Sequence, residues 1–369
     1  MRKCKLGDLF EIKQGYAFKS EKYQSAGKYV LCTLGNISAD NNFKYDLSKA
    51  NYYPDDFSHT FILEEGDLII PLTEQAVGLF GNTAFVPPTN GFQFVLNQRV
   101  GKVTPKKDVA DKYYLHYLLS TELVRNQIEA TATGTSQRNT SPEKIYDVTV
   151  WVPDIEQQRK IGKTLFDLER KVNINKLIND NLQQQMSLIY EDMMAKAKSE
   201  KITGAFVVAK NLTDIITGKE DANFSTPNGK YKFFTCSNEP LRCDEFVFDS
   251  SSILIAGNGD FNVKHYTGKF NAYQRTYVLT PQSKYYALLY LASLYRINSF
   301  KSNSSGSIVK FITKGDVESI PVFIPDDFSY LEKLNALVRL QEQNQCENEE
   351  LAQLRDWLLP MLMNGQATV

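Results

Sequence analysis

Two long stretches of the chain carry apolar residues at alternating intervals of four and three positions. The first stretch follows residue 154, and the second follows residue 327. This spacing places one narrow apolar seam along a helix, which is typical of a coiled coil. The seam positions of the first stretch include Leu165, Leu168, Val172, Leu182 and Met186, and those of the second include Leu337, Leu351 and Leu358.

Both seams turn polar near their middle. The central seam positions are Asn175 and Asn179 in the first stretch, and Asn344 and Asn348 in the second. An asparagine at a seam costs stability but fixes the register of the helices. Antiparallel pairing would bring the two polar centres together, so we predict that the helices pack as an antiparallel coiled coil. The alternative is two separate amphipathic helices, each lying on its own domain.

The segments outside these helices show short apolar runs bounded by Gly, Asn, Asp or Pro, which predict strands. In each segment the strands are followed by one tyrosine-rich helix. Strands first and a helix afterwards favour an α+β domain over alternating βαβ units. The expected strands are residues 29–34, 67–72, 83–86, 232–235, 253–256 and 273–279, and the expected helices are 112–130 and 284–300.

Several short sequence blocks occur twice in the same order, which is the mark of an internal repeat. The Gln98-Arg99 pair returns as Gln274-Arg275, and Gly27-Lys28-Tyr29 returns as Gly229-Lys230-Tyr231. We therefore expect two similar α/β domains, separated and followed by the long helices. The predicted boundaries are 1–153 for domain 1, 154–200 for the central helix, 201–326 for domain 2 and 327–369 for the distal helix.

Composition narrows the class of protein. The chain has 42 Lys and Arg against 43 Asp and Glu, and 42% hydrophobic residues, as ordinary globular proteins do. Its longest apolar run is too short to predict a membrane span. The start has no apolar leader, and the five cysteines form no C-x-x-C pair, so we expect a reducing cytoplasm and no zinc site.

Catalytic motifs are missing from the pattern. Gly162-Lys163-Thr164 resembles the end of a phosphate-binding loop, but Gln157 occupies the position of the first glycine. Gly257-Asn258-Gly259 follows a strand without a helix after it, which favours a turn. His59, His116 and His265 show no ligand spacing. We expect no catalytic residues, no metal and no cofactor bound by this chain.

Two polar loops, residues 131–139 and 302–310, are candidates for binding DNA, and we call them the glycine-hydroxyl loops. Small hydroxyls, amides and a glycine permit close approach to phosphate oxygens, and Arg, Gln and Asn can reach base edges. The alternative is a solvated surface loop. The candidates are Thr135, Ser136, Gln137, Arg138, Ser305, Ser307 and Lys310.

Several segments together resemble the specificity subunits of type I restriction-modification systems, over essentially the whole chain. The second Pro-Asp junction departs from the pattern, because it continues as Asp327-Phe328-Ser329-Tyr330. The segments that carry the resemblance are Leu6-Gly7-Asp8-Leu9-Phe10 with Gly15-Tyr16-Ala17-Phe18, Glu156-Gln157-Gln158-Arg159-Lys160-Ile161, Gly268-Lys269-Phe270-Asn271-Ala272-Tyr273-Gln274-Arg275 and Leu358-Leu359-Pro360-Met361-Leu362-Met363-Asn364-Gly365.

The resemblance implies a non-catalytic DNA-binding subunit. Each domain would read one half of a bipartite DNA sequence, with the helices as spacer. Within that picture the repeated Gln-Arg pairs would face the DNA, together with an opening loop in each domain; the alternative for the pairs is a strand arginine that pairs with an acid. These candidates are Gln98, Arg99, Gln274 and Arg275, and Gln14, Tyr16, Lys19 and Lys219. The helices would also dock modification subunits, which carry S-adenosylmethionine, and restriction subunits would join for cleavage. A rigid spacer can hold two readers about one turn of DNA apart, roughly 34 to 36 Å. A coiled-coil scaffold and a self-contained DNA-modifying enzyme are the alternatives.

Overall fold

The computed structural model describes residues 1–74, 78–134, 137–259, 261–302 and 311–369. The contacts between residues divide the chain into two compact units. Unit 1 holds residues 1–172 and 350–369, and unit 2 holds residues 173–349. Each long helix therefore contributes residues to both units. The four-segment division expected from the sequence stays a prediction.

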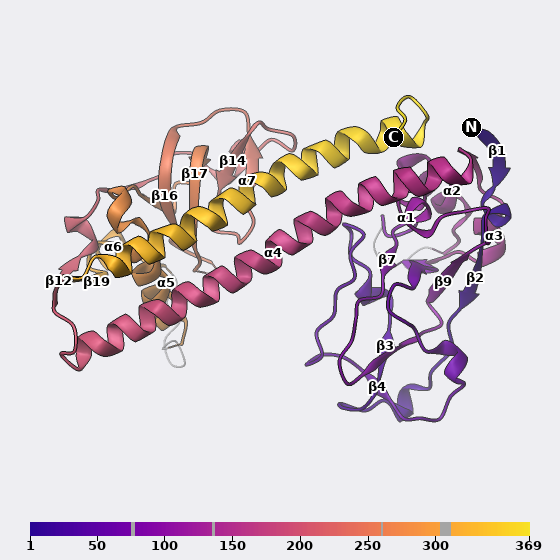
Figure 1. Cartoon of the computed structure of the whole chain (residues 1–369), viewed down its shortest axis with the longest axis horizontal. Coiled ribbons are helices and arrows are strands. Elements are labelled where there is room, and N and C mark those ends of the chain that lie inside the picture. Colours follow the sequence, from indigo (N-terminus) through magenta and orange to yellow (C-terminus); the bar gives the residue numbers. More distant parts are fainter. Residues whose placement is uncertain (75–77, 135–136, 260, 303–310) are drawn as a thin grey trace. The chain divides into compact units, whose positions relative to one another are not determined.

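Unit 1 is built on a four-stranded antiparallel sheet and a smaller three-stranded sheet (Figure 1). Helices pack beside the larger sheet and close its core, to which Leu6, Phe10 and Tyr114 contribute fully buried side chains. The larger sheet has the order β2 (Phe10–Gln14), β9 (Val100–Pro105), β5 (Leu68–Pro71), β7 (Ala84–Phe85), and the smaller one β4 (Tyr52–Tyr53), β3 (Tyr29–Cys32), β8 (Gln93–Leu96). The other elements are the pairs β1 (Arg2–Lys5) with β11 (Thr149–Val152) and β6 (Thr73–Glu74) with β10 (Arg138–Asn139), and the helices α1 (Lys112–Ser120), α2 (Glu122–Thr131) and α3 (Pro142–Tyr146).

Unit 2 carries one six-stranded sheet, whose inner face is covered by the apolar helix α5 (Tyr286–Ser302). The order of this sheet is β13 (Ile215–Thr217), β18 (Thr276–Leu279), β16 (Phe248–Ala256), β17 (Val263–Ala272), β14 (Tyr231–Phe234), β15 (Leu241–Cys243). A separate antiparallel pair joins β12 (Gly204–Val208) to β19 (Pro321–Pro325), and the short helix α6 (Lys314–Glu318) precedes β19.

The two units share one plan, which confirms the expectation of two similar α/β domains. In each, one strand pair is parallel: β3 with β8 in unit 1, and β14 with β17 in unit 2. In each, the strand that leads into a long helix pairs with the first strand of its unit, β11 with β1 and β19 with β12.

Every strand expected from the sequence overlaps a strand of the structure. The helix expected over 112–130 is broken at Thr121, whose backbone is extended and whose hydroxyl donates to Leu118 O.

An aspartate caps the start of each long helix: Asp154 directly precedes the first, and one residue separates Asp327 from the second. Helix α4 covers Ile155–Lys198, and the carboxylate of Asp154 accepts from Gln157 N at 2.9 Å. Helix α7 covers Ser329–Met363, and Asp327 accepts from Ser329 N at 2.9 Å. Such caps satisfy N–H groups that have no partner in the first turn. Within the described ranges, no helix combines the length and apolar character needed to cross a bilayer.

Inside unit 2, the polar centres of α4 and α7 contact each other through amides. Asn175 Nδ2 donates to Asn348 Oδ1 at 2.9 Å, and Asn344 Nδ2 donates to Asn179 Oδ1 at 2.8 Å. Residue numbers rise along α4 as they fall along α7, so the helices run in opposite directions there. Among the apolar seam residues, Leu165, Leu182 and Met186 are buried, whereas Leu168, Val172, Leu337, Leu351 and Leu358 are half-buried.

A glycine at the same place in each unit allows two strands to approach closely. Gly15 N donates to Val100 O, and Gly218 N donates to Thr276 O. A Cβ on Gly15 would lie 2.1 Å from Asn97 O, and one on Gly218 would lie 1.9 Å from Ala272 O. Both positions therefore exclude any side chain.

We expect Gly15→Ala to lower the free energy of unfolding by about 1 to 3 kcal/mol, because the new methyl group forces a backbone carbonyl away. Gly35→Ala is the matched control, since the nearest atom to its added Cβ is Thr33 Oγ1 at 3.6 Å. Its effect should stay within about 0.5 kcal/mol. Chemical denaturation measures both, and equal stability of the two variants would contradict the close approach.

Candidate nucleic-acid interface

The candidate segments of unit 1 are joined in one row by backbone hydrogen bonds. Gln98 N donates to Tyr16 O, Leu72 N donates to Arg99 O, and Thr140 N donates to Leu72 O, at 2.9 to 3.0 Å. The opening loop, the Gln-Arg pair and the end of the glycine-hydroxyl loop therefore lie side by side at one end of the sheets. The sequence predicted these three groups separately, and nothing in it indicated that they lie next to one another.

Unit 2 repeats the row with equivalent residues. Gln274 N donates to Glu220 O, Gly257 N donates to Arg275 O, and Ile312 N donates to Gly257 O, each at 2.8 Å. The order of the bonds is the same as in unit 1, and the Gln-Arg pair occupies the same step. We call these two sets of segments the unit 1 row and the unit 2 row.

The Gln-Arg side chains of both rows are available to a ligand. Gln98, Gln274 and Arg275 are exposed, and Arg99 is half-buried. Within the part of the chain that the structure describes, neither guanidinium has a hydrogen bond or an ion pair. An acidic partner, the alternative left open for these arginines, is therefore absent among the described residues.

The opening loop of unit 1 adds an amide, a ring and a cation. Gln14 Nε2 donates to Gln98 O at 3.2 Å, which fixes this side chain beside the pair. The Tyr16 ring is 41% exposed and packs on Phe18, with ring centroids 5.1 Å apart. Lys19 is exposed, as is Lys219 in unit 2.

Arg138 is held by protein groups, in contrast to Arg99 and Arg275. Its guanidinium forms an ion pair with Glu74 at 2.9 Å, and it donates to Glu129 O at 2.9 Å. The Glu74 side chain is almost fully buried and also accepts from Leu79 N at 3.0 Å. This pair therefore joins β10 to β6 and the following turn, a role that the sequence reasoning missed because 64 positions separate the partners.

Of the remaining candidates in the glycine-hydroxyl loops, Gln137 lies within the described residues. Gln137 is half-buried, and its Nε2 donates to Asn139 Oδ1 at 3.3 Å. Thr135, Ser136, Ser305, Ser307 and Lys310 lie outside the described residues.

One histidine of each unit, the buried His116 and the half-buried His265, contacts a glutamate of a long helix. His116 Nε2 lies 3.7 Å from Glu169, to which Tyr117 Oη donates at 2.7 Å. Burial by itself would raise the pKa of Glu169, but the nearby imidazole of His116 and the hydrogen bond from Tyr117 outweigh it and hold this pKa below its usual value. In unit 2, His265 Nδ1 lies 3.4 Å from Glu342 Oε1 of α7. In unit 1 these contacts join α1 to α4, and in unit 2 the contact of His265 with Glu342 joins β17 to α7.

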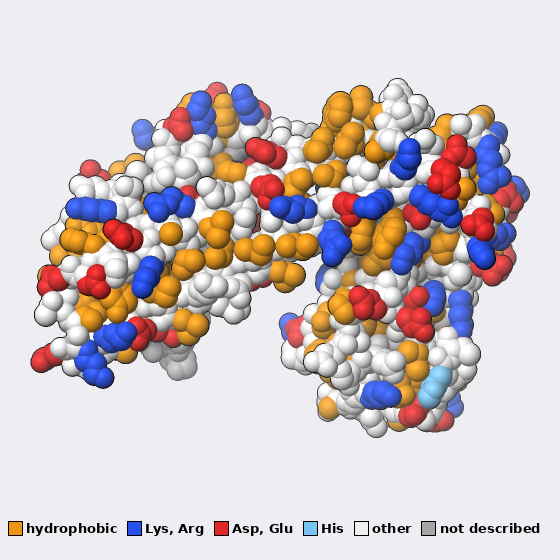
Figure 2. Space-filling view, viewed as in Figure 1, with side chains coloured by type: hydrophobic (Ala, Val, Ile, Leu, Met, Phe, Trp, Pro, Cys, Tyr) orange, Lys and Arg blue, Asp and Glu red, His pale blue; other side chains and the backbone are white. Residues whose placement is uncertain are grey.

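No group of three or more His, Cys, Asp or Glu side chains in the described ranges is arranged to hold a metal ion. On the face shown in Figure 2, basic and acidic side chains are interspersed over each unit. The accessible cations of the two rows are thus local features on a surface of mixed charge.

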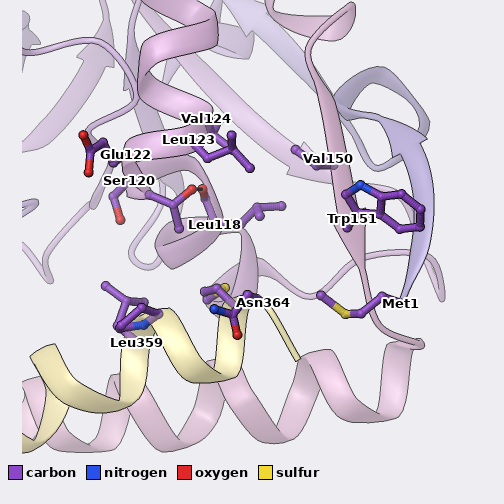
Figure 3. Close-up of a pocket in the computed structure, with 13 residues that line it drawn as sticks. Met1, Leu118, Ser120, Glu122, Leu123, Val124, Val150, Trp151, Leu359 and Asn364 are labelled. Carbon is purple, nitrogen blue, oxygen red and sulfur yellow. Dashed lines mark hydrogen bonds between the residues drawn. The ribbon is translucent and has the colours of Figure 1, made fainter. Parts of the chain in front are cut away.

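Unit 1 also contains an apolar cavity of about 520 Å³, between α1, α2, β11 and the end of α7. Figure 3 shows Leu123, Trp151 and Leu359 around it. The Trp151 and Leu123 side chains are 54% and 64% exposed. An open apolar hollow of this kind is typical of a surface that a partner covers.

Comparison with known proteins places the chain in a family. The model of the type I restriction modification DNA specificity domain matches residues 1–184 and 207–355. The chain is 38% identical over 164 residues to the EcoDI specificity subunit of Escherichia coli, a match covering 42% of this chain and 37% of that protein. It is 21% identical over 183 residues to the MjaVIII specificity subunit of Methanocaldococcus jannaschii, covering 49% of this chain and 42% of that protein.

The chain thus matches less than half of the length of these relatives. A crystal structure of the type I restriction-modification system S subunit from M. genitalium has the same fold, with a TM-score of 0.63 and 16% identity. That similarity covers 98% of this chain and 96% of the other. The chain belongs to the family of type I restriction modification DNA specificity domains.

Proposed function

We propose that this chain is the sequence-reading subunit of a type I restriction-modification complex, with each unit binding one half of a bipartite DNA sequence. The observation that carries the proposal is the repeated row. Two equivalent Gln-Arg pairs are held by the same backbone bonds, and their guanidiniums have no partner among the described residues. Two matched readers in one chain suit a target made of two half-sites.

The side chains of the rows have the chemistry that base reading needs. An arginine can donate two hydrogen bonds to guanine O6 and N7, and a glutamine can pair with adenine in the same way. Lys19 and Lys219 supply cations for backbone phosphates, which fix orientation without reading sequence. The small hydroxyls of the glycine-hydroxyl loops serve the same purpose.

The long helices act as the spacer between the readers. We infer that α4 and α7 form an antiparallel coiled coil, whose register is set by the amides at its centre. The bonds from Asn175 to Asn348 and from Asn344 to Asn179 support this pairing. Buried amides discriminate between registers because a slipped pairing would leave them without partners.

The proposed subunit performs no chemistry itself. Modification subunits would bind S-adenosylmethionine and methylate the DNA, restriction subunits would join them for cleavage, and the complex would work in the cytoplasm. An apolar stripe on α4 supports docking: Ile174, Leu177 and Ile178 are 41%, 69% and 41% exposed. Their spacing places them on one face, as a partner helix requires.

Arg275→Ala should weaken DNA binding by about 1 to 3 kcal/mol and relax specificity at one position of one half-site. Arg99→Ala should do the same in the other half-site. Binding is measured on the complex with its modification subunits, and methylated positions are mapped in genomic DNA. Equal loss over all DNA sequences would instead mean that these arginines contact phosphates.

Arg138→Ala is the matched control for those two variants. Because Arg138 pairs with the buried Glu74, its loss leaves an uncompensated carboxylate. We expect it to lower the free energy of unfolding by about 3 kcal/mol, whereas Arg99→Ala leaves stability almost unchanged. If Arg138→Ala relaxed specificity without loss of stability, the glycine-hydroxyl loop would be a base reader of its own.

Leu177→Asp should abolish co-purification with modification subunits and leave the melting temperature almost unchanged, because its side chain is mostly exposed. A charge at an apolar contact loses burial and adds desolvation cost. Gln184→Asp places the same charge on an exposed position of the same helix and should retain assembly. Assembly by both variants would show that the stripe is not the docking surface.

A further inference from the structure

Lys264 is a half-buried cation of unit 2 that no part of the proposed function uses. It lies on β17 opposite Leu254 of β16. Its ammonium group donates to Thr235 O at 3.2 Å and also to Ser237 O. Two carbonyls hold the group in place and neutralise none of its charge.

The surroundings of Lys264 contain no counter-ion in contact with it. No ion pair to it occurs within the described ranges, and Cys236 and Glu239 act on it only through space. Burial lowers the pKa of Lys264 to about 8. Lys232 of the neighbouring strand β14 shows the usual arrangement, because it is buried and pairs with Glu349. A partly desolvated cation without an anion is costly, so an external anion would stabilise it.

Lys264 is connected to the unit 2 row. The turn that its ammonium group binds also receives Asn262 Nδ2, which donates to Cys236 O at 2.8 Å. Cys236 Sγ in turn contacts Arg275 O at 3.7 Å, the carbonyl that accepts from Gly257 N in the row. The cation is thus anchored beside the Gln-Arg pair.

We propose that Lys264 binds a phosphate of the DNA backbone next to the bases that Gln274 and Arg275 read. This inference rests on the proposed function and adds the contact that orients the second reader. In unit 1 the equivalent ladder position is Ala84, which is fully buried opposite Ile69. The contact therefore belongs to one half-site only.

A phosphate at this site would return Lys264 to its ordinary protonated state. The free protein loses the proton as the pH rises through about 8, so binding above that pH takes up one proton. Affinity should therefore fall about tenfold between pH 7 and pH 9, and should be nearly constant below pH 7. Glu239 and the thiol of Cys236 are the other titratable groups that act on Lys264.

The test measures binding of the complex with its modification subunits to its target duplex, at pH 7 and pH 9 and at several salt concentrations. Lys264→Met should weaken binding about tenfold at pH 7 and reduce the salt slope by about one. Lys264→Arg should keep most affinity but lose the pH dependence, because a guanidinium stays charged. Cys236→Ser should keep the pH dependence.

Lys269→Met is the matched control, since Lys269 lies on the same strand with its ammonium over the Phe246 ring. It should change neither the affinity nor the pH dependence. Normal binding by Lys264→Met at pH 7, or a pH dependence that Lys264→Arg retains, would overturn the inference. The proposed function is tested separately: if Arg275→Ala still loses specificity in one half-site, the proposed function holds even when the inference about Lys264 fails. Melting temperatures identify any variant that fails to fold.

Discussion

Each of the two rows depends on backbone hydrogen bonds that join three distant segments at one end of a sheet. Because the main chain makes these bonds, the side chains of Gln98, Arg99, Gln274 and Arg275 are not needed to hold the segments together. They can therefore differ between relatives without loss of fold. The constraint falls on Gly15 and Gly218 instead, where any Cβ would meet a backbone carbonyl.

Directional contacts also hold each long helix against its unit. Glu169 and Glu342 are charged groups in largely apolar surroundings, and each contacts a histidine and accepts a hydrogen bond from a tyrosine of its unit. Such a carboxylate is satisfied in one geometry only, because any other leaves a buried charge without partners. Directional bonds as well as apolar packing therefore hold α1 against α4 in unit 1 and β17 against α7 in unit 2.

Periodicity and repetition predicted much of this architecture. The four-three spacing located α4 and α7, and the amides at the seam centre pair as the antiparallel arrangement requires in unit 2. The repeated Gln-Arg pair correctly predicted equivalent positions in the two units. The partners of Arg138 and His116 could not be predicted, because Glu74 and Glu169 are distant in sequence and any nearby acid would have suited equally. The break at Thr121 was not predicted either, because the sequence pattern is helical there. In the structure the Thr121 hydroxyl donates to Leu118 O at the end of α1.

In the proposed function, a chain of net charge near zero would make its DNA contacts through a few well-placed cations. Arg99 and Arg275 would meet this need because their guanidiniums have no partner among the described residues, and Lys264 would meet it through partial burial. Burial weakens a cation in the free protein but strengthens its attraction to a phosphate, because less water screens the pair. Under the proposal, Lys264 would orient the second half-site through this attraction. Unit 1, which has Ala84 at the equivalent position, would bind its half-site without that dependence on pH.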